Sequence, residues 1–412
     1  MAEAQSQNVI TLLYFAAAST ATGKTIEQIP IPSSGLPLSS LSDHLASLYP
    51  STNLAKVLQT SQWSVNEEMV DEPSSVTLKG GEEVAVIPPV SGGLQPHPII
   101  TKSAFRATRL TPSTFLVKEY NDIFSEHPHI YVKVMPSVNA VLVIDTGTGG
   151  KSNDHEVEVT SLRQFLETVN VIDNDNQPLN GGGKMKYVVV TTHCHYDHIR
   201  TPPRIDRNAD SVILASGHSK AFLSLVKLPE HSLCNALHIR TPQYAPKLIP
   251  HGYIITSPSR PHTSLNITLL HTPGHTPDEL AVYDSNEMML YVGDSLYEHE
   301  PIIFPKEGSI VAWFESMDYL MTFVLERNGG IWHESQDKEV LINAGHRTAA
   351  QPALEVLSSS KAFMEDVVKG RELVRGRLKV RGEDNLVFEQ AGGRFSLRCP
   401  ERLLEEARRK IH

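Results

Sequence analysis

Six consecutive residues, His-Cys-His-Tyr-Asp-His at 193–198, bring three imidazoles and a carboxylate together. An apolar, β-branched run at 187–192 precedes them and predicts a buried strand. We expect His193 and His195 to alternate as strand residues do and to point the same way, with Asp197 and His198 in the turn that follows. Imidazole and carboxylate groups suit zinc and similar transition metals, and packing alone does not explain such costly polar groups beside a buried strand. The stretch therefore predicts a metal site, with Cys194 pointing away from it as a packed residue.

Three later apolar, strand-like runs are each followed by one side chain of a kind that binds metal ions. The runs lie at 269–270, 288–292 and 340–344, and the side chains that follow them are His275, Asp294 and His346. A glycine precedes each of these side chains and leaves room for a close approach of the backbone. Taken singly, each segment predicts no more than a turn with a hydrogen-bonded or solvated side chain.

Taken together with the first cluster, the order His-x-His-x-Asp-His, Gly-His, Gly-Asp, Gly-His resembles the metallo-β-lactamase superfamily over residues 105–350. The resemblance implies an αββα sandwich with the site at one edge of the two sheets. It also implies two metal ions, either Zn²⁺ or, as alternatives, iron or manganese. The ligands that it implies are His193, His195 and His275 for one ion, Asp197, His198 and His346 for the other, and Asp294 as the bridge.

Within that family Asp197 would also be the catalytic group that orients the attacking water and takes up its proton. The implied activity is hydrolysis of an ester, thioester, lactone or similar small substrate, because fold analogy does not choose among them. Asp145, at the end of a strand-like run, is either a carboxylate that supports a ligating histidine or a turn residue. Four aromatic residues after Asp294 either line a substrate pocket or belong to the core: Tyr297, Phe304, Trp313 and Phe314.

One departure from the family pattern lies beside the metals. Members commonly have Gly-Gly soon after the last histidine of the first motif, whereas this chain has Arg-Thr-Pro-Pro at 200–203. We expect an altered loop there, and with it altered access to the second metal.

The first ninety residues predict a small α+β domain with strands at 9–16, 25–31, 63–66 and 83–87. Leu41, Leu45 and Leu48 recur at helical spacing, with Ser39 and Ser40 as expected N-caps. The order strand, strand, helix, strand, strand is that of a ubiquitin-like β-grasp fold.

The end of this domain, Leu-Lys-Gly-Gly-Glu-Glu-Val-Ala-Val-Ile-Pro-Pro-Val-Ser-Gly-Gly at 78–93, resembles the molybdopterin synthase small subunit family. That resemblance implies a sulfur carrier in molybdenum cofactor biosynthesis, with the large subunit and an E1-like adenylating and sulfurating enzyme as partners. The resemblance also implies that Gly92 and Gly93 form the carrier tail, since a tail without side chains can thread into a narrow site. Leu94 follows Gly93, so no free carboxylate is present there. Cleavage after Gly93, a lost carrier function with the tail as a linker, and a gene model that joins two reading frames remain open. In the carrier alternative the hydrolase domain is vestigial or separately expressed.

Length and composition fit this two-part organisation. The chain has 412 residues, and we expect a β-grasp domain at 1–93, a linker at 94–104 and a second domain at 105–412, with a C-terminal extension from about 352. A net charge of -10 disfavours nucleic acid as a partner and leaves a small molecule as the expected substrate. Three cysteines give no disulfide framework, and neither a signal peptide nor an apolar stretch long enough for a membrane is apparent. We therefore expect a cytoplasmic protein without membrane association.

Overall fold

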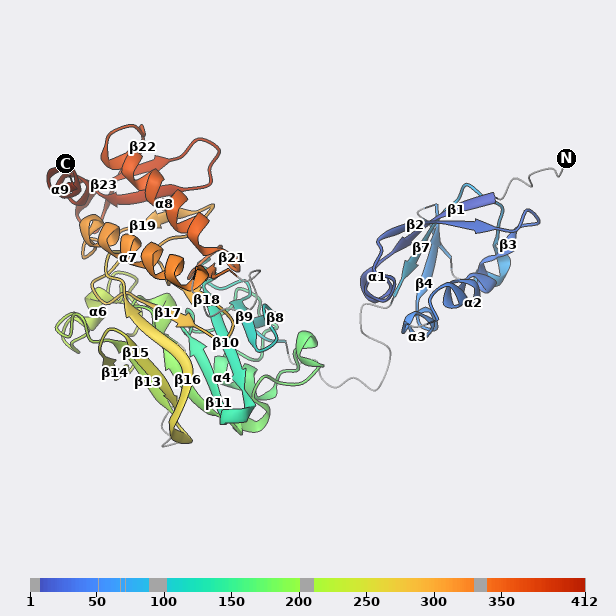
Figure 1. Cartoon of the computed structure of the whole chain (residues 1–412), viewed down its shortest axis with the longest axis horizontal. Coiled ribbons are helices and arrows are strands. Elements are labelled where there is room, and N and C mark those ends of the chain that lie inside the picture. The colour runs from blue at the N-terminus through green and yellow to red at the C-terminus, as the bar shows by residue number, and fades with distance from the viewer. Residues whose placement is uncertain are drawn as a thin grey trace. The chain divides into compact units, whose positions relative to one another are not determined.

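The chain forms two compact units, residues 1–100 and 101–412 (Figure 1). The computed structural model describes residues 8–50, 52–66, 68–70, 72–88, 102–200, 211–329 and 339–411. The expected carrier tail, Gly92 and Gly93, lies outside these residues, as do 94–101 of the expected linker. Within the described ranges no helix is long and apolar enough to cross a bilayer.

The first unit is a five-stranded sheet with helices against it, in the order β2-β1-β7-β4-β5. Strand β1 pairs antiparallel with β2 and parallel with β7, which confirms the β-grasp arrangement. The core joins sheet residues such as Leu12 and Val84 to Leu41 and Leu45 of the central helix. The elements are β1 (Asn8–Tyr14), α1 (Ala16–Thr22), β2 (Ile26–Ile31), β3 (Leu36–Pro37), α2 (Leu38–Leu48), α3 (Leu54–Leu58), β4 (Gln62–Val65), β5 (Glu68–Val70), β6 (Thr77–Leu78) and β7 (Glu83–Ile87).

The expected caps of the central helix are wrong. Helix α2 begins at Leu38, so Ser39 and Ser40 lie inside its first turn. The reason is the short pairing of β3 with β6, which continues as a bond from the Leu38 amide to the Val76 carbonyl. The short helices α1 and α3 carry no strong apolar period and were not expected.

The second unit contains two facing sheets. The first has seven strands in the order β14-β13-β12-β11-β10-β9-β8, and the second has six in the order β15-β16-β17-β18-β20-β21. Strands β11 to β14 are parallel. The strands of the first sheet are β8 (Phe105–Arg109), β9 (Thr114–Glu119), β10 (His129–Met135), β11 (Ala140–Ile144), β12 (Lys186–Val190), β13 (Val212–Ser216) and β14 (Lys247–Ile249). Those of the second are β15 (Tyr253–Ser257), β16 (Arg260–His271), β17 (Leu280–Asp284), β18 (Met289–Tyr291), β20 (Leu341–Asn343) and β21 (Gln351–Pro352).

Alternation along the strands builds the layers. Val188 and Val190 of β12 face the other sheet, whereas Tyr187 and Val189 face the helical side. Helix α4 (Leu162–Thr168) covers that outer face, and α7 (Ile310–Asn328) and α8 (Ala353–Val368) cover the outer face of the second sheet. This is the expected αββα sandwich. Helix α4 begins directly after Ser161, its N-cap, whose side chain accepts from the Gln164 amide.

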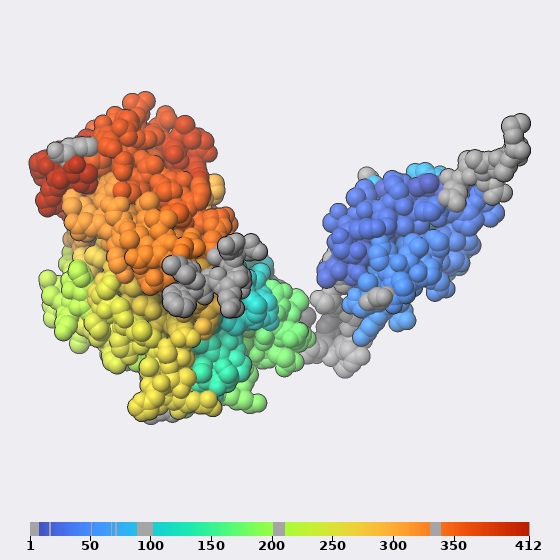
Figure 2. Space-filling view, viewed as in Figure 1, coloured from blue at the N-terminus to red at the C-terminus, as the bar shows by residue number. Residues whose placement is uncertain are grey.

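The C-terminal extension adds a small sheet in the order β19-β24-β23-β22. Its strands are β19 (Pro301–Ile303), β22 (Val374–Val380), β23 (Glu383–Glu389) and β24 (Ser396–Pro400), and helix α9 (Glu401–Ile411) follows. Phe388, Phe395 and Leu397 share one hydrophobic cluster with Trp313 and Met317 of α7. The extension is therefore part of the second unit, and its red surface continues into the orange surface in Figure 2.

Candidate metal centre

The predicted ligands meet at one edge of the two sheets, where several strands end. His193 and His195 follow β12, and Asp197 lies in the short helix α5 (Tyr196–Ile199). His275, Asp294 and His346 follow β16, β18 and β20 of the other sheet. All seven expected ligand residues fall into two groups of four buried side chains, which share Asp294.

The strand placement of the first two histidines is wrong, although both reach the site. Strand β12 ends at Val190, and His195 is already the N-cap residue of α5. The chain leaves the sheet because the Thr192 amide donates to the Asp145 carboxylate at 2.7 Å rather than to a neighbouring strand.

The first group contains His193, His195, His275 and Asp294. Nδ1 of His195 lies 3.0 Å from Nε2 of His193 and 3.0 Å from Nε2 of His275. Oδ2 of Asp294 lies 3.9 Å from each of these two Nε2 atoms. Three nitrogens and one oxygen thus converge on one point, as in a tetrahedral zinc site.

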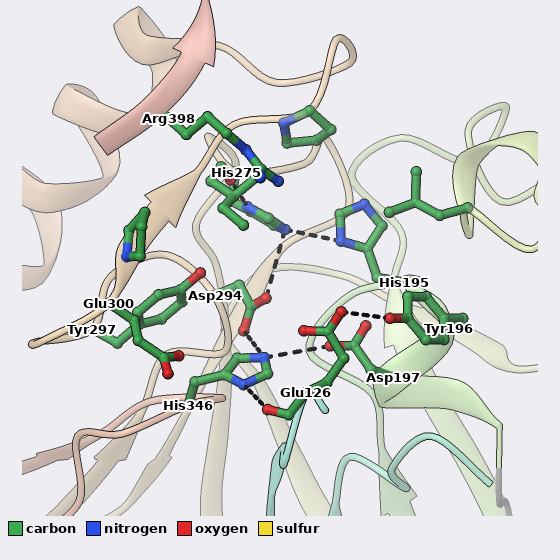
Figure 3. A pocket seen from close by; sticks show the side chains of 14 residues that line it. Glu126, His195, Tyr196, Asp197, His275, Asp294, Tyr297, Glu300, His346 and Arg398 are labelled. Carbon is green, nitrogen blue, oxygen red and sulfur yellow. Dashed lines mark hydrogen bonds and ion pairs between the residues drawn. The ribbon is translucent and has the colours of Figure 1, made fainter. Parts of the chain in front are cut away.

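The second group contains Asp197, His198, Asp294 and His346. Oδ2 of Asp197 lies 3.4 Å from Nε2 of His198 and 3.3 Å from Nε2 of His346. Here Asp294 contributes its other oxygen, Oδ1, at 3.4 and 3.7 Å from the same two nitrogens. Asp294 therefore offers one carboxylate oxygen to each group (Figure 3).

Hydrogen bonds on the far side of the imidazole rings orient four of the five histidines. Nδ1 of His198 donates to Asp145 Oδ2 at 2.8 Å, and Asp145 also accepts from the Thr192 hydroxyl at 2.9 Å. Nδ1 of His275 donates to the Ile303 carbonyl at 2.7 Å and Nδ1 of His346 to the Glu126 carbonyl at 3.0 Å. Nδ1 of His193 lies 3.1 Å from the Thr192 hydroxyl. Each bond leaves Nε2 free to face the site, which is the usual support for metal-binding imidazole. Of the two interpretations of Asp145, the supporting carboxylate is the one found.

Electrostatics distinguish the two groups. Burial holds the pKa of His193 well below its usual range and lowers the pKa of His195 to about 3, so the first group consists of neutral imidazoles. Burial alone would lower the pKa of His346, but the carboxylates of Asp294 and Asp197 raise it to about 9. Burial raises the pKa of Asp294, yet the neighbouring His198 and His346 hold it well below its usual range. The second group therefore attracts positive charge.

Two polar atoms of the site have no hydrogen-bond partner in the described part of the chain. Nε2 of His198 and Oδ1 of Asp294 are both fully buried, and both point into the second group. A buried polar atom without a partner is costly. A divalent cation between these atoms would remove that cost, so the residues present fit a metal ion.

Close contacts require glycine at all three positions, and a Cβ atom on Gly293 would lie 2.2 Å from Glu279 Oε1. A Cβ atom on Gly345 would lie 2.3 Å from Asp294 Oδ1 and 2.8 Å from His198 Cε1. A Cβ atom on Gly274 would lie 2.7 Å from the Cα atom of Trp313 in α7. Gly345 thus leaves room for the ligands, as expected, whereas Gly274 leaves room for a helix.

A cavity of about 170 Å³ opens onto the two groups (Figure 3). Tyr297 lines this cavity, as one of the two interpretations expected. Phe304, Trp313 and Phe314 do not; they lie in the hydrophobic core, where the Trp313 indole donates to the Ser295 carbonyl at 2.6 Å. Cys194 is fully buried, in a different hydrophobic cluster, and belongs to neither ligand group.

Sequence reasoning missed charged residues that line the cavity, among them Glu126 and Arg398. Glu126 lies between β9 and β10 and accepts a hydrogen bond of 2.6 Å from the Tyr196 hydroxyl. Arg398 lies on β24 of the extension. Neither residue stands in a motif, so no sequence signal pointed to them. In the altered loop, Arg200 lies against the Phe124 ring at 5.6 Å, and 201–203 lie outside the described residues.

Comparison with known proteins gives separate matches for the two units. Residues 12–93 match the family described as ThiS. A molybdopterin synthase sulfur carrier subunit from Mycosarcoma maydis is 45% identical over 86 residues, which are 20% of this chain and 92% of that protein.

A longer match is a protein of Aspergillus versicolor named "Putative transcription factor avaE". It is 30% identical over 314 residues, 74% of this chain and 89% of that protein. The acyl-coenzyme A thioesterase MBLAC2 of Gallus gallus is 24% identical over 193 residues, 44% of this chain and 63% of that protein, so the chain spans less than two thirds of this relative. Among solved structures, a metallo-β-lactamase from Pontibacter korlensis aligns with 64% of this chain and 99% of that chain, at 15% identity and a TM-score of 0.42.

Proposed function

We propose that the second domain of this chain hydrolyses a small ester or thioester with two divalent metal ions, preferably Zn²⁺. The chain belongs to the family of the Aspergillus versicolor relative. It joins a ThiS-type domain to a hydrolase domain of the metallo-β-lactamase superfamily. His193, His195 and His275 would hold one ion and Asp197, His198 and His346 the other, with Asp294 between them.

The observation that carries this proposal is the division of the Asp294 carboxylate between two groups of ligands. Its Oδ2 faces the first group and its Oδ1 the second, and the buried Oδ1 has no hydrogen-bond partner among the described residues. A structural site for one metal would need neither a bridging carboxylate nor an adjoining cavity. The name of the Aspergillus versicolor relative concerns transcription, whereas a net charge of -10 disfavours binding to nucleic acid phosphates.

When bound, two such cations lower the pKa of a shared water and polarise the oxygen of the scissile group. Side chains of the cavity would orient the water, accept its proton and donate a hydrogen bond to the substrate. Asp197 lines the cavity beside both groups and would orient the attacking water and accept its proton. Tyr297 also lines the cavity, and no hydrogen bond to its hydroxyl is present within the described residues, so it would donate to an oxygen of the substrate.

A thioester is the substrate class that the named relatives favour. MBLAC2 of Gallus gallus and of Homo sapiens, at 24% and 26% identity, are both named acyl-coenzyme A thioesterases. A thioester also needs less activation of the leaving group than an amide, because a thiolate leaves readily. The cavity of about 170 Å³ suits a short acyl group at the metals.

Metal content tests the proposal directly. We expect about two equivalents of zinc per purified chain by mass spectrometry of the metal content, and a loss of about one equivalent in His195→Ala. The matched control is His262→Ala, because His262 is exposed on β16 and lies in neither group. Less than one equivalent, unchanged by His195→Ala, would overturn the metal site. A panel of thioesters, lactones and phosphodiesters then identifies the substrate class.

The first unit supports a second function, that of a sulfur carrier in molybdenum cofactor assembly. The match to the ThiS family over residues 12–93 ends at Gly93. We propose that cleavage after Gly93 would free the carboxylate for conversion to a thiocarboxylate, with the molybdopterin synthase large subunit and an E1-like enzyme as partners. Intact-mass measurement on protein from its native cell tests this: a fragment ending at Gly93, with oxygen replaced by sulfur, supports the carrier, and full-length protein alone contradicts it.

A further inference from the structure

One strand of the C-terminal extension forms part of the wall of the metal cavity. Strand β24 pairs parallel with β19, and in this register Arg398 lies opposite Ile303. The Ile303 carbonyl is the group that accepts from Nδ1 of His275, and the amide of Phe304 donates to the Arg398 carbonyl at 2.8 Å. The backbone at Arg398 is therefore fixed relative to a residue of the first ligand group.

The Arg398 side chain points to the cavity and not to the core. Its neighbours on the strand, Leu397 and Cys399, are fully buried in the hydrophobic cluster of the extension. Strand alternation places Arg398 on the opposite face, and Figure 3 shows it beside His275 at the rim of the cavity. Arg398 also lines an adjoining cavity of about 70 Å³.

Arg398 differs from the other cations nearby in its partners. Lys306 and Arg381 also line the adjoining cavity, but Lys306 pairs with Glu230 at 2.5 Å and Arg381 pairs with Glu307 through two bonds of 2.8 and 2.9 Å. Within 102–200, 211–329 and 339–411, no side-chain hydrogen bond or ion pair to Arg398 is found.

Among the described residues, none of the acidic side chains that line the metal cavity pairs with Arg398, and Asp197 and Asp294 face the histidines of the ligand groups instead. Glu300 pairs with Arg347 at 2.6 Å, and Glu126 accepts from Tyr196 at 2.6 Å. A guanidinium with free donors thus faces the space where substrate would lie.

We propose that Arg398 binds an anionic group of the substrate, a carboxylate or a phosphate, and that the C-terminal extension thereby selects anionic over neutral substrates. The inference rests on the proposed function for the reaction at the metals, but the binding of the anion itself does not. A guanidinium offers two parallel N–H donors that match both of these oxyanions. The substrate would then place its reacting bond at the metals and its anionic group on the β24 side.

Matched substrates test the proposal. Butyryl and succinyl thioesters of N-acetylcysteamine differ at the end of the acyl chain, where a methyl group is replaced by a carboxylate. Butyryl-pantetheine and butyryl-phosphopantetheine differ by a phosphate on the thiol side. We expect Arg398→Gln to lower kcat/KM about 10- to 100-fold on the succinyl or the phosphorylated probe. On the neutral probes the loss should stay below about twofold.

Two further variants separate recognition from structure. Arg398→Lys keeps the charge but not the planar fork, so we expect it to recover part of the loss. Arg377→Gln removes an exposed arginine of the same small sheet, which pairs with Glu401. This variant should leave kcat/KM unchanged on all four probes. Equal losses on anionic and neutral probes, or no loss on either anionic probe, would overturn the role of Arg398.

A binding measurement keeps this inference distinguishable from the proposed reaction. Calorimetric titration of the full chain with succinate and with inorganic phosphate needs no turnover. At least about tenfold weaker binding of one of these anions by Arg398→Gln supports the anion site even if no probe is hydrolysed. Unchanged binding of both anions overturns the anion site even if the neutral thioesters are hydrolysed.

Discussion

Asp145→Asn should weaken the second metal group and leave the first almost unchanged. Asp145 accepts three hydrogen bonds, from Nδ1 of His198 at 2.8 Å and from the amide and hydroxyl of Thr192 at 2.7 and 2.9 Å. An asparagine has one acceptor oxygen, so whichever way it turns, its NH₂ group faces either the imidazole N–H or the Thr192 amide. The variant thus places two donors opposite each other in a buried position.

The size of the effect follows from the bond that is lost. A hydrogen bond to a charged acceptor contributes about 1.5–3 kcal/mol. Because about 1.4 kcal/mol corresponds to a factor of ten, the affinity of the second group for Zn²⁺ should fall about 10- to 100-fold. The first group has no direct hydrogen bond to Asp145 among the described residues; it is linked only through the Thr192 hydroxyl, which lies 3.1 Å from Nδ1 of His193, so its affinity for Zn²⁺ should change by less than about twofold.

Competition with a chromophoric zinc chelator measures the two affinities, and background variants assign them. In His195→Ala the remaining site is the second group, and in Asp197→Ala it is the first. Adding Asp145→Asn should weaken binding in the first background only. Asp173→Asn, which changes a carboxylate in an exposed turn, is the matched control. An equal loss in both backgrounds, or no loss in either, would refute the role assigned to Asp145.

Other features of the second unit predict three further outcomes. Gly345→Ala should reduce bound zinc by about one equivalent, because the new methyl group would overlap Asp294 and His198; full metal content in this variant would contradict the close packing. Burial raises the pKa of Glu119 from 4.5 to about 7. As the pH rises, the unfolded chain therefore releases this proton before the folded chain does. The free energy of unfolding should fall by about 3 kcal/mol between pH 4.5 and 7. Glu119→Gln should remove that pH dependence from the thermal midpoint, and parallel pH profiles for the two proteins would contradict it. Tyr297→Phe should lower kcat about tenfold with zinc content unchanged, and an unaltered kcat would exclude its hydroxyl from the reaction.

Most of the framework was predictable from local patterns. Apolar runs ending in Gly-His or Gly-Asp predicted where β16, β18 and β20 stop, and the ligands that follow each strand meet in the site. The β-grasp order was predictable from four strands and one apolar helical face, and the parallel pairing of β1 with β7 completes it. The errors lie where a tertiary contact overrides a local preference: Thr192 leaves the β12 ladder for the Asp145 carboxylate, and α2 starts before its serines because the Leu38 amide bonds to Val76.

The sequence by itself determined which residues can bind metal and in what order they occur, because ligand chemistry is a property of residue type and strand ends are encoded by short apolar runs. Only the tertiary structure decided how these ligands are divided between the two groups and which residues hydrogen-bond to them. It divided the two oxygens of Asp294 between the groups, set the Glu126 carbonyl against His346, and brought Arg398 of the extension to the wall of the cavity. These contacts join segments far apart in the chain through sheet pairing and loop packing, and neither leaves a periodic pattern in the sequence.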